Sequence, residues 1–64
     1  MSPIRVLLAD DHTVVRAGLR NALEVLPNLE ILGEVGNGHD LMEALARIRP
    51  DLLVMDVSMP DFEP

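Results

Sequence analysis

The sequence predicts an α/β fold in which a parallel β-sheet has helices on both faces. Three observations predict it: two apolar runs that each end directly at an aspartate, two segments with helical periodicity between strand-like segments, and connections long enough for right-handed crossovers. The predicted order along the chain is therefore strand, helix, strand, helix, strand.

The first strand and the first helix are predicted at residues 4–9 and 13–26. The strand is apolar apart from Arg5 and stops at Asp10, which is typical of a buried strand in a parallel sheet. In the helix, apolar residues recur at steps of three and four, which indicates an amphipathic helix that ends before Pro27. The stripe expected to face the core comprises Val15, Gly18, Leu19, Ala22, Leu23 and Leu26.

The second and third strands are predicted at residues 29–35 and 52–55, and a second helix is predicted between them, with Asp40 near its start and Arg49 near its end. The second strand alternates, which favours a half-exposed strand with Leu29, Ile31 and Val35 on one side and Glu30 and Glu34 on the other. A Gly-Asn-Gly turn precedes the second helix, and a proline closes it. Its apolar stripe comprises Leu41, Met42, Leu45 and Ile48. The third strand is wholly apolar and ends at Asp56.

The character of each strand predicts the order of the strands in the sheet. Strands that are apolar on both faces belong inside a parallel sheet, whereas an alternating strand suits an edge. The expected order is 2-1-3, with one helix on each face. The third strand would then lie at an edge although it is apolar, and an apolar edge tends to pair with another chain. We therefore expect further strands beyond Pro64 in the complete domain.

Composition limits the possible functions. The chain of 64 residues can form one small domain, and the absence of cysteine excludes disulfides and thiolate metal sites. No apolar run approaches the ~20 residues that span a bilayer, and no signal-peptide pattern is present, so we expect a soluble cytoplasmic protein with no membrane segment. The net charge of −6 opposes direct binding of nucleic acid by this segment.

Asp10, Asp11 and Asp56 form the candidate functional site. They follow strands one and three, whose carboxyl ends are expected to meet where the strand order reverses. Three carboxylates at one point repel one another unless a cation joins them, and oxygen ligands partly open to water suit Mg²⁺. Asp56 would be able to attack a phosphoryl group directly. Any one of these aspartates is better explained as a helix cap or turn residue, but the combination favours a site.

The segments RVLLADDHTVVRAGLRNALE, GEVGNGHDLMEAL and RPDLLVMDVSMPDF resemble successive signatures of response-regulator receiver domains of two-component systems. The segment DDHTVVRAGL resembles the corresponding segment of the LuxR/NarL/FixJ-type subfamily. The resemblance covers essentially the whole chain and implies a flavodoxin-like, doubly wound parallel sheet. It implies that Asp56 is the phosphoacceptor, that Asp11 is a direct Mg²⁺ ligand, and that Asp10 acts through metal-bound water. It further implies that the backbone carbonyl of Ser58 is the remaining protein ligand.

The resemblance also implies partners and missing parts. A histidine kinase would be the phosphodonor, the domain would be no enzyme beyond its own phosphorylation, and a C-terminal helix-turn-helix in the intact parent would bind DNA and control transcription. Met59 and Pro60 match the active-site loop. Residues 61–64 lack the usual glycine, and the chain has no lysine and no fourth or fifth strand to provide the catalytic Lys and Ser/Thr. Residues 1–64 are thus expected to be a partial receiver domain.

Two other functions are compatible with parts of the sequence. A half-receiver that no longer accepts phosphate would instead bind a partner, or a second copy through the exposed edge of strand three. A metal-dependent hydrolase would use the same carboxylates but lacks an evident general base. We expect His12 to be a local capping or loop residue, His39 to face solvent at a helix start, and Met59 to be exposed.

Overall fold

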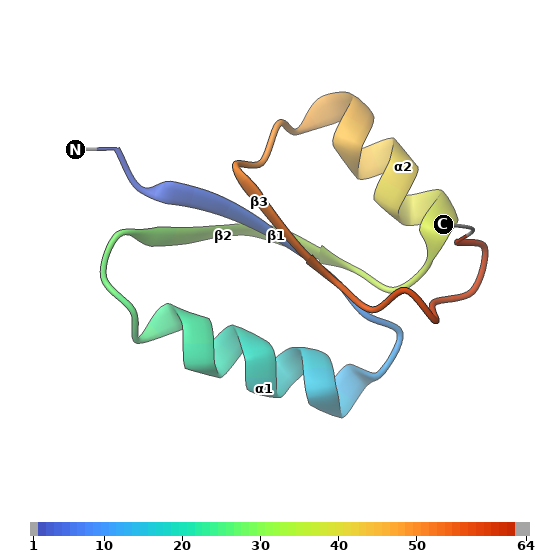
Figure 1. Cartoon of the computed structure of the whole chain (residues 1–64), viewed down its shortest axis with the longest axis horizontal. Helices are drawn as coiled ribbons and strands as arrows, with labels where there is room; N and C mark the ends of the chain where they lie inside the picture. Colours follow the sequence, from blue (N-terminus) through green and yellow to red (C-terminus); the bar gives the residue numbers. More distant parts are fainter. Residues whose placement is uncertain (1, 63–64) are drawn as a thin grey trace.

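The computed structural model describes residues 2–62 and contains all the predicted elements. In chain order they are β1 (Ile4–Ala9), α1 (Thr13–Glu24), β2 (Leu29–Val35), α2 (Gly38–Arg47) and β3 (Leu52–Met55). The strands form one parallel sheet in the order β2-β1-β3, and α1 and α2 lie on opposite sides of it (Figure 1). The predicted α/β class, strand order and strand bounds are confirmed. The sequence also predicts a loop at residues 60–64, of which Glu63 and Pro64 lie outside the described residues.

The central strand β1 contains the most deeply buried residues of the sheet. Its last four residues are fully buried, because β2 and β3 flank it and a helix lies over each face. Leu7 and Ala9 pack with Leu41 and Ala44 of α2 in the main core cluster. Since side chains alternate along a strand, Val6 and Leu8 point to the other face, on the side of α1.

A β-bulge in β2 changes the faces that the alternating sequence predicts. Val6 is paired with Ile31, but Leu7 is paired with Gly33, so Leu32 is an extra residue in β2. Beyond the bulge, Val35 is paired with Ala9 and packs against the α2 core, whereas Ile31 lies on the α1 side. The prediction that Ile31 and Val35 share a side was therefore wrong. By the same shift Glu34 faces α1.

Helix α1 is only partly covered. It ends at Glu24 rather than at Leu26, because a residue that precedes proline disfavours helical backbone angles. Within residues 2–62, α1 has no fully buried residue: its predicted stripe is half-buried at Leu19 and Leu23, and Val15 remains 50% exposed. α1 lies mainly over β2 and β1, and part of its apolar surface faces outward, as Val14 does at 85% exposure. No helix in the described part of the chain is long and apolar enough to cross a membrane.

Helix α2 covers the other face and holds the segment after β3. Its inward residues include Leu41 and Ala44, whereas Met42, which was predicted to face the core, is 65% exposed because it lies about 100° around the helix from Leu41. The prediction that Met59 is exposed was also wrong, because its side chain is 3% exposed and packs in the α2 core cluster. His39 is exposed near the helix start, as predicted.

Candidate functional site

The parallel pairing of β1 with β3 places two of the predicted site residues side by side. Ala9 is paired with Met55 at the ends of the strands, and the next residues are Asp10 and Asp56. The Asp56 amide donates to the Ala9 carbonyl at 2.8 Å, and the Asp10 amide donates to the Val35 carbonyl at 3.0 Å. Both aspartates therefore leave the sheet at its carboxyl edge with their backbones held by hydrogen bonds.

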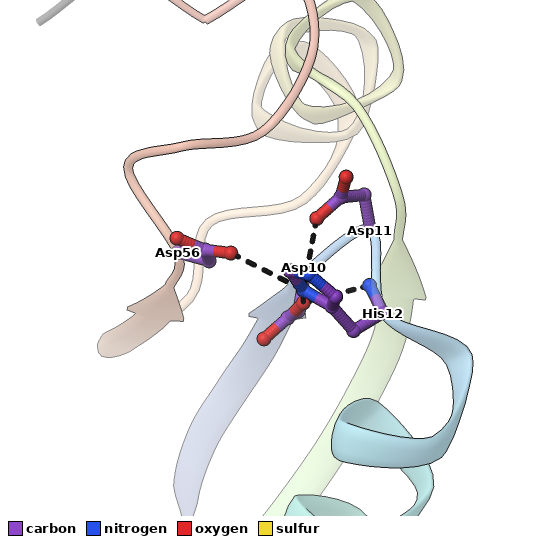
Figure 2. A group of neighbouring side chains, drawn as sticks. All are labelled: Asp10, Asp11, His12 and Asp56. Atoms are coloured by element: carbon purple, nitrogen blue, oxygen red, sulfur yellow. Dashed lines mark hydrogen bonds and ion pairs between the residues drawn. The ribbon is translucent and has the colours of Figure 1, made fainter.

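The structure brings Asp10, Asp11 and Asp56 together with His12 (Figure 2). One candidate ligand atom from each of the four residues lies within 4.8 Å of all the others. The His12 Nδ1 atom is at the centre, 2.8 Å from Asp10 Oδ1, 3.1 Å from Asp11 Oδ1 and 3.4 Å from Asp56 Oδ2. Asp10 is only 7% exposed, whereas the His12 side chain is 58% exposed. The cluster is therefore buried at Asp10 and open to solvent at His12.

His12 has a larger part in the cluster than the sequence predicted. It holds the N-cap position of α1, but among the described residues its side chain makes no capping hydrogen bond. The imidazole instead turns to the carboxylates. The hydrogen bond to Asp10, and then the negative charges of Asp11 and Asp10, raise the pKa of His12 above 6.5. Its place directly after an acidic pair was the available signal for this role.

Asp56 is held from one side by Ser58. The Asp56 Oδ1 atom accepts hydrogen bonds from the Ser58 amide at 2.9 Å and from the Ser58 hydroxyl at 2.7 Å. These two bonds, in that order, lower the pKa of Asp56 below 3.8, with a smaller contribution from the positive charge of His12. The second oxygen, Oδ2, faces the cluster, and a quarter of the side chain is exposed. Asp56 is therefore an ionised carboxylate whose Oδ1 atom is fixed by Ser58 and whose Oδ2 atom faces His12.

The loop that follows Asp56 is fixed against α2. Met59 inserts into the core, and its amide donates to the Asp56 carbonyl at 3.3 Å. The Pro60 carbonyl accepts a hydrogen bond from the Gly38 amide at 2.8 Å. Gly38 allows this approach, because a Cβ there would lie 1.9 Å from the Asp61 carbonyl oxygen. The predicted loop residues Met59 and Pro60 thus connect the cluster to the first turn of α2.

The fold and the carboxylate cluster define an α/β domain with its site at the carboxyl edge of an open parallel sheet. Residues 6–63 match the response regulator receiver domain family, so the chain belongs to that family of two-component signalling proteins.

Two curated relatives and a solved structure show the same relationship. The uncharacterized transcriptional regulatory protein YxjL of Bacillus subtilis is 42% identical over 89% of this chain, and the DNA-binding transcriptional activator DevR/DosR of Mycobacterium tuberculosis is 43% identical over 91%. The chain spans 26% and 27% of their lengths. The non-phosphorylated receiver domain of RcsB from Escherichia coli matches with a TM-score of 0.86 and 32% identity, over 92% of this chain and 45% of that domain. The resemblance to LuxR/NarL-type regulators is thereby confirmed.

Proposed function

We propose that this chain is the phosphoacceptor part of a response regulator, and that it receives a phosphoryl group on Asp56 from a histidine kinase. One observation supports the proposal above all others: ligand atoms of Asp10, Asp11 and Asp56 gather within 4.8 Å at the carboxyl ends of β1 and β3. Three acidic side chains at such close range favour a divalent cation, and the Oδ2 atom of Asp56 faces the cluster from a side chain that is 25% exposed.

The donor set suits Mg²⁺, which prefers carboxylate and carbonyl oxygens and keeps several waters. We assign Asp11 and Asp56 as direct ligands, Asp10 as a ligand through water, and the Ser58 backbone carbonyl as the remaining protein ligand. Bound Mg²⁺ would neutralise the charge of the carboxylates and of the incoming phosphoryl oxygens. A His12 imidazolium would compete with the metal for the same oxygens.

The residues of this chain account for the acceptor half of the transfer. Asp56 Oδ2 attacks the phosphorus of the donor, the bond from phosphorus to the donor nitrogen or oxygen breaks, and an acyl phosphate forms on Asp56. Ser58 keeps Oδ1 engaged with its amide and hydroxyl, which leaves Oδ2 as the nucleophile. No general base is required, because the carboxylate is ionised at neutral pH.

In its parent protein the segment would be the first part of a receiver domain. Residues 1–64 would contribute three strands and two helices, with the phosphoryl-contacting Ser or Thr and the Lys on later strands. The parent would control transcription in the cytoplasm through a DNA-binding output domain. The segment would contribute no enzymatic turnover of its own, and no DNA contact either, since its net charge is −6.

Mass spectrometry of the intact chain tests this function. Incubation with acetyl phosphate and MgCl₂ is expected to add one phosphoryl group, and EDTA or Asp56→Asn is expected to abolish the addition. Asp61→Asn is the matched control, because it removes an exposed carboxylate nearby at a left-handed backbone position that asparagine also tolerates. An adduct that survives Asp56→Asn, or no adduct on the unchanged chain, would contradict the proposal.

A further inference from the structure

Arg16 joins the acidic turn to the rest of the fold. It lies in α1, and its Nη1 atom donates to the backbone carbonyl of Asp10 at 2.7 Å. Its Nε atom lies 3.2 Å from Glu34 Oε1, so one guanidinium connects the end of β1 to β2. The Arg16 side chain is 23% exposed, and hydrogen bonds from a partly buried guanidinium are stronger than neutral ones.

The contact acts on the peptide group between the two neighbouring aspartates. The amide of Asp10 is held by the Val35 carbonyl, and the carbonyl of Asp10 is held by Arg16. A peptide unit is planar, so fixing the direction of the Asp10 carbonyl also fixes the amide and Cα of Asp11. The direction in which the Asp11 carboxylate leaves the backbone therefore depends on Arg16.

We propose that Arg16 is a positioning residue for the metal site, acting through the Asp10 carbonyl to set the orientation of Asp11. This inference rests on the proposed function, since it concerns the same Mg²⁺ site. Arg16 touches none of the carboxylate oxygens assigned as ligands; it fixes the backbone from which they extend.

Two neighbouring features fit this role. The bulge in β2 turns Glu34 toward α1, where its carboxylate pairs with the Nε atom of Arg16. Gly36 leaves room for the contact, because a Cβ there would lie 3.0 Å from Arg16 Nη1 and 3.8 Å from the Asp10 carbonyl oxygen. The backbone of Gly36 does not have a positive φ, so Gly36→Ala crowds the guanidinium without straining its own backbone.

Arg20 provides a matched control on the same helix. It lies one turn after Arg16 and pairs with the same Glu34, but its other partner is Glu24, at 2.7 Å. Arg16→Gln and Arg20→Gln each remove one positive charge and one partner of Glu34. Only Arg16→Gln removes the hydrogen bond to the Asp10 carbonyl.

Calorimetric titration of the chain with MgCl₂ at constant ionic strength separates positioning from charge. Loss of a positive charge by itself favours Mg²⁺ binding, so Arg20→Gln is expected to bind Mg²⁺ as tightly as the unchanged chain or slightly more tightly. Arg16→Gln is expected to bind about tenfold more weakly, the size of loss typical when a group that orients metal ligands is removed. Arg16→Lys retains a donor but not the fork of the guanidinium, and is expected to restore affinity in part.

A spectroscopic measurement without metal keeps the test independent of binding. In ¹H–¹⁵N NMR spectra, Arg16→Gln and Gly36→Ala are both expected to shift the Asp11 amide resonance, and Arg20→Gln is expected to leave it in place. Equal Mg²⁺ affinity in Arg16→Gln and Arg20→Gln would overturn the inference and leave the proposed function standing. Failure of the unchanged chain to bind Mg²⁺ would overturn both.

Discussion

His12 places a titratable positive charge among three carboxylates. In the protonated state its ring reduces their mutual repulsion, since Nδ1 lies between 2.8 and 3.4 Å from an oxygen of each. The acidic cluster is therefore partly neutralised by the chain itself when the imidazole is protonated.

We expect the pKa of His12 to lie above 6.5, because its hydrogen bond to Asp10 and the negative charges around it favour the protonated ring. A raised pKa contributes stability that is fully present below pH 6.5 and is lost as the pH rises through the folded-state value. NMR titration of the imidazole protons measures this directly. Asp10→Asn is expected to lower the pKa of His12 and Asp40→Asn to leave it unchanged; a pKa insensitive to Asp10→Asn would contradict the assignment.

Ser58 controls the ionisation of Asp56. Ser58→Ala removes the hydroxyl and keeps the amide, so the pKa of Asp56 is expected to rise toward 3.8, and Ser58→Thr is expected to retain the low value. The depressed pKa contributes stability above pH 3.8 that is lost as the pH falls through the folded-state value, and Ser58→Ala reduces that contribution. Carboxyl ¹³C NMR titration gives both values. No difference between Ser58→Ala and Ser58→Thr would argue against the hydroxyl bond.

Only some of the residues in the cluster could be predicted from the sequence. Asp10 and Asp56 were predictable, because each directly follows an apolar strand and parallel strands end at a common edge. Arg16 and the side chains of His12 and Ser58 were not predicted to contact the site. Their contacts depend on rotamers and on the exact turn of the chain, which no periodicity in the sequence encodes.

At the scale of elements, the strand bounds followed from apolar runs, but the faces of β2 did not. The bulge at Leu32 adds one residue, and one residue reverses every side chain beyond it. Glu34 consequently meets the arginines of α1. Nothing in the alternation of residues 29–35 marks where the extra residue lies, because Leu32 is apolar and suits either face.

Gly38 is expected to be indispensable at the start of α2. Gly38→Ala would place a methyl group 1.9 Å from the Asp61 carbonyl oxygen, so the loop after Asp56 must move away, and we expect a loss of about 1–3 kcal/mol in the free energy of unfolding. Urea denaturation followed by circular dichroism measures the loss.

Gly18→Ala is the matched control for that substitution. A Cβ at Gly18 meets no atom within 4 Å, and alanine is the better helix former, so we expect a gain of up to about 1 kcal/mol. Equal effects of the two substitutions, in either direction, would show that the contact with Asp61 does not limit position 38.

At the scale of the whole molecule, both outer strands of the described sheet, β2 and β3, have an unpaired edge, and β3 is the wholly apolar one. Within residues 2–62, β3 pairs only with β1; Leu52 at its start is 45% exposed, and Val57, two residues after its end, is 62% exposed. An apolar edge strand is a template for pairing with another chain. We therefore expect residues 1–64, studied alone, to self-associate as concentration rises.

Sedimentation equilibrium tests this expectation. Leu52→Lys is expected to reduce association, because a charge at an edge strand opposes pairing. Val25→Lys also replaces an exposed apolar residue with lysine, but at the C-cap of α1, which is 79% exposed and belongs to no strand, and it should have little effect. A monomer at all concentrations would contradict the role of this edge.

The parallel pairing of β1 with β3 has a thermodynamic consequence for the molecule. Asp10 and Asp56 are neighbours only while those strands are paired, so the unfolded chain has no preformed cluster to offer a cation. A cation that binds only the folded chain stabilises it by mass action, by about 2.7 kcal/mol at a concentration one hundred times its dissociation constant. The free metal concentration is then a variable of the folding equilibrium itself, and the population of folded chains reports how much of the ion is bound.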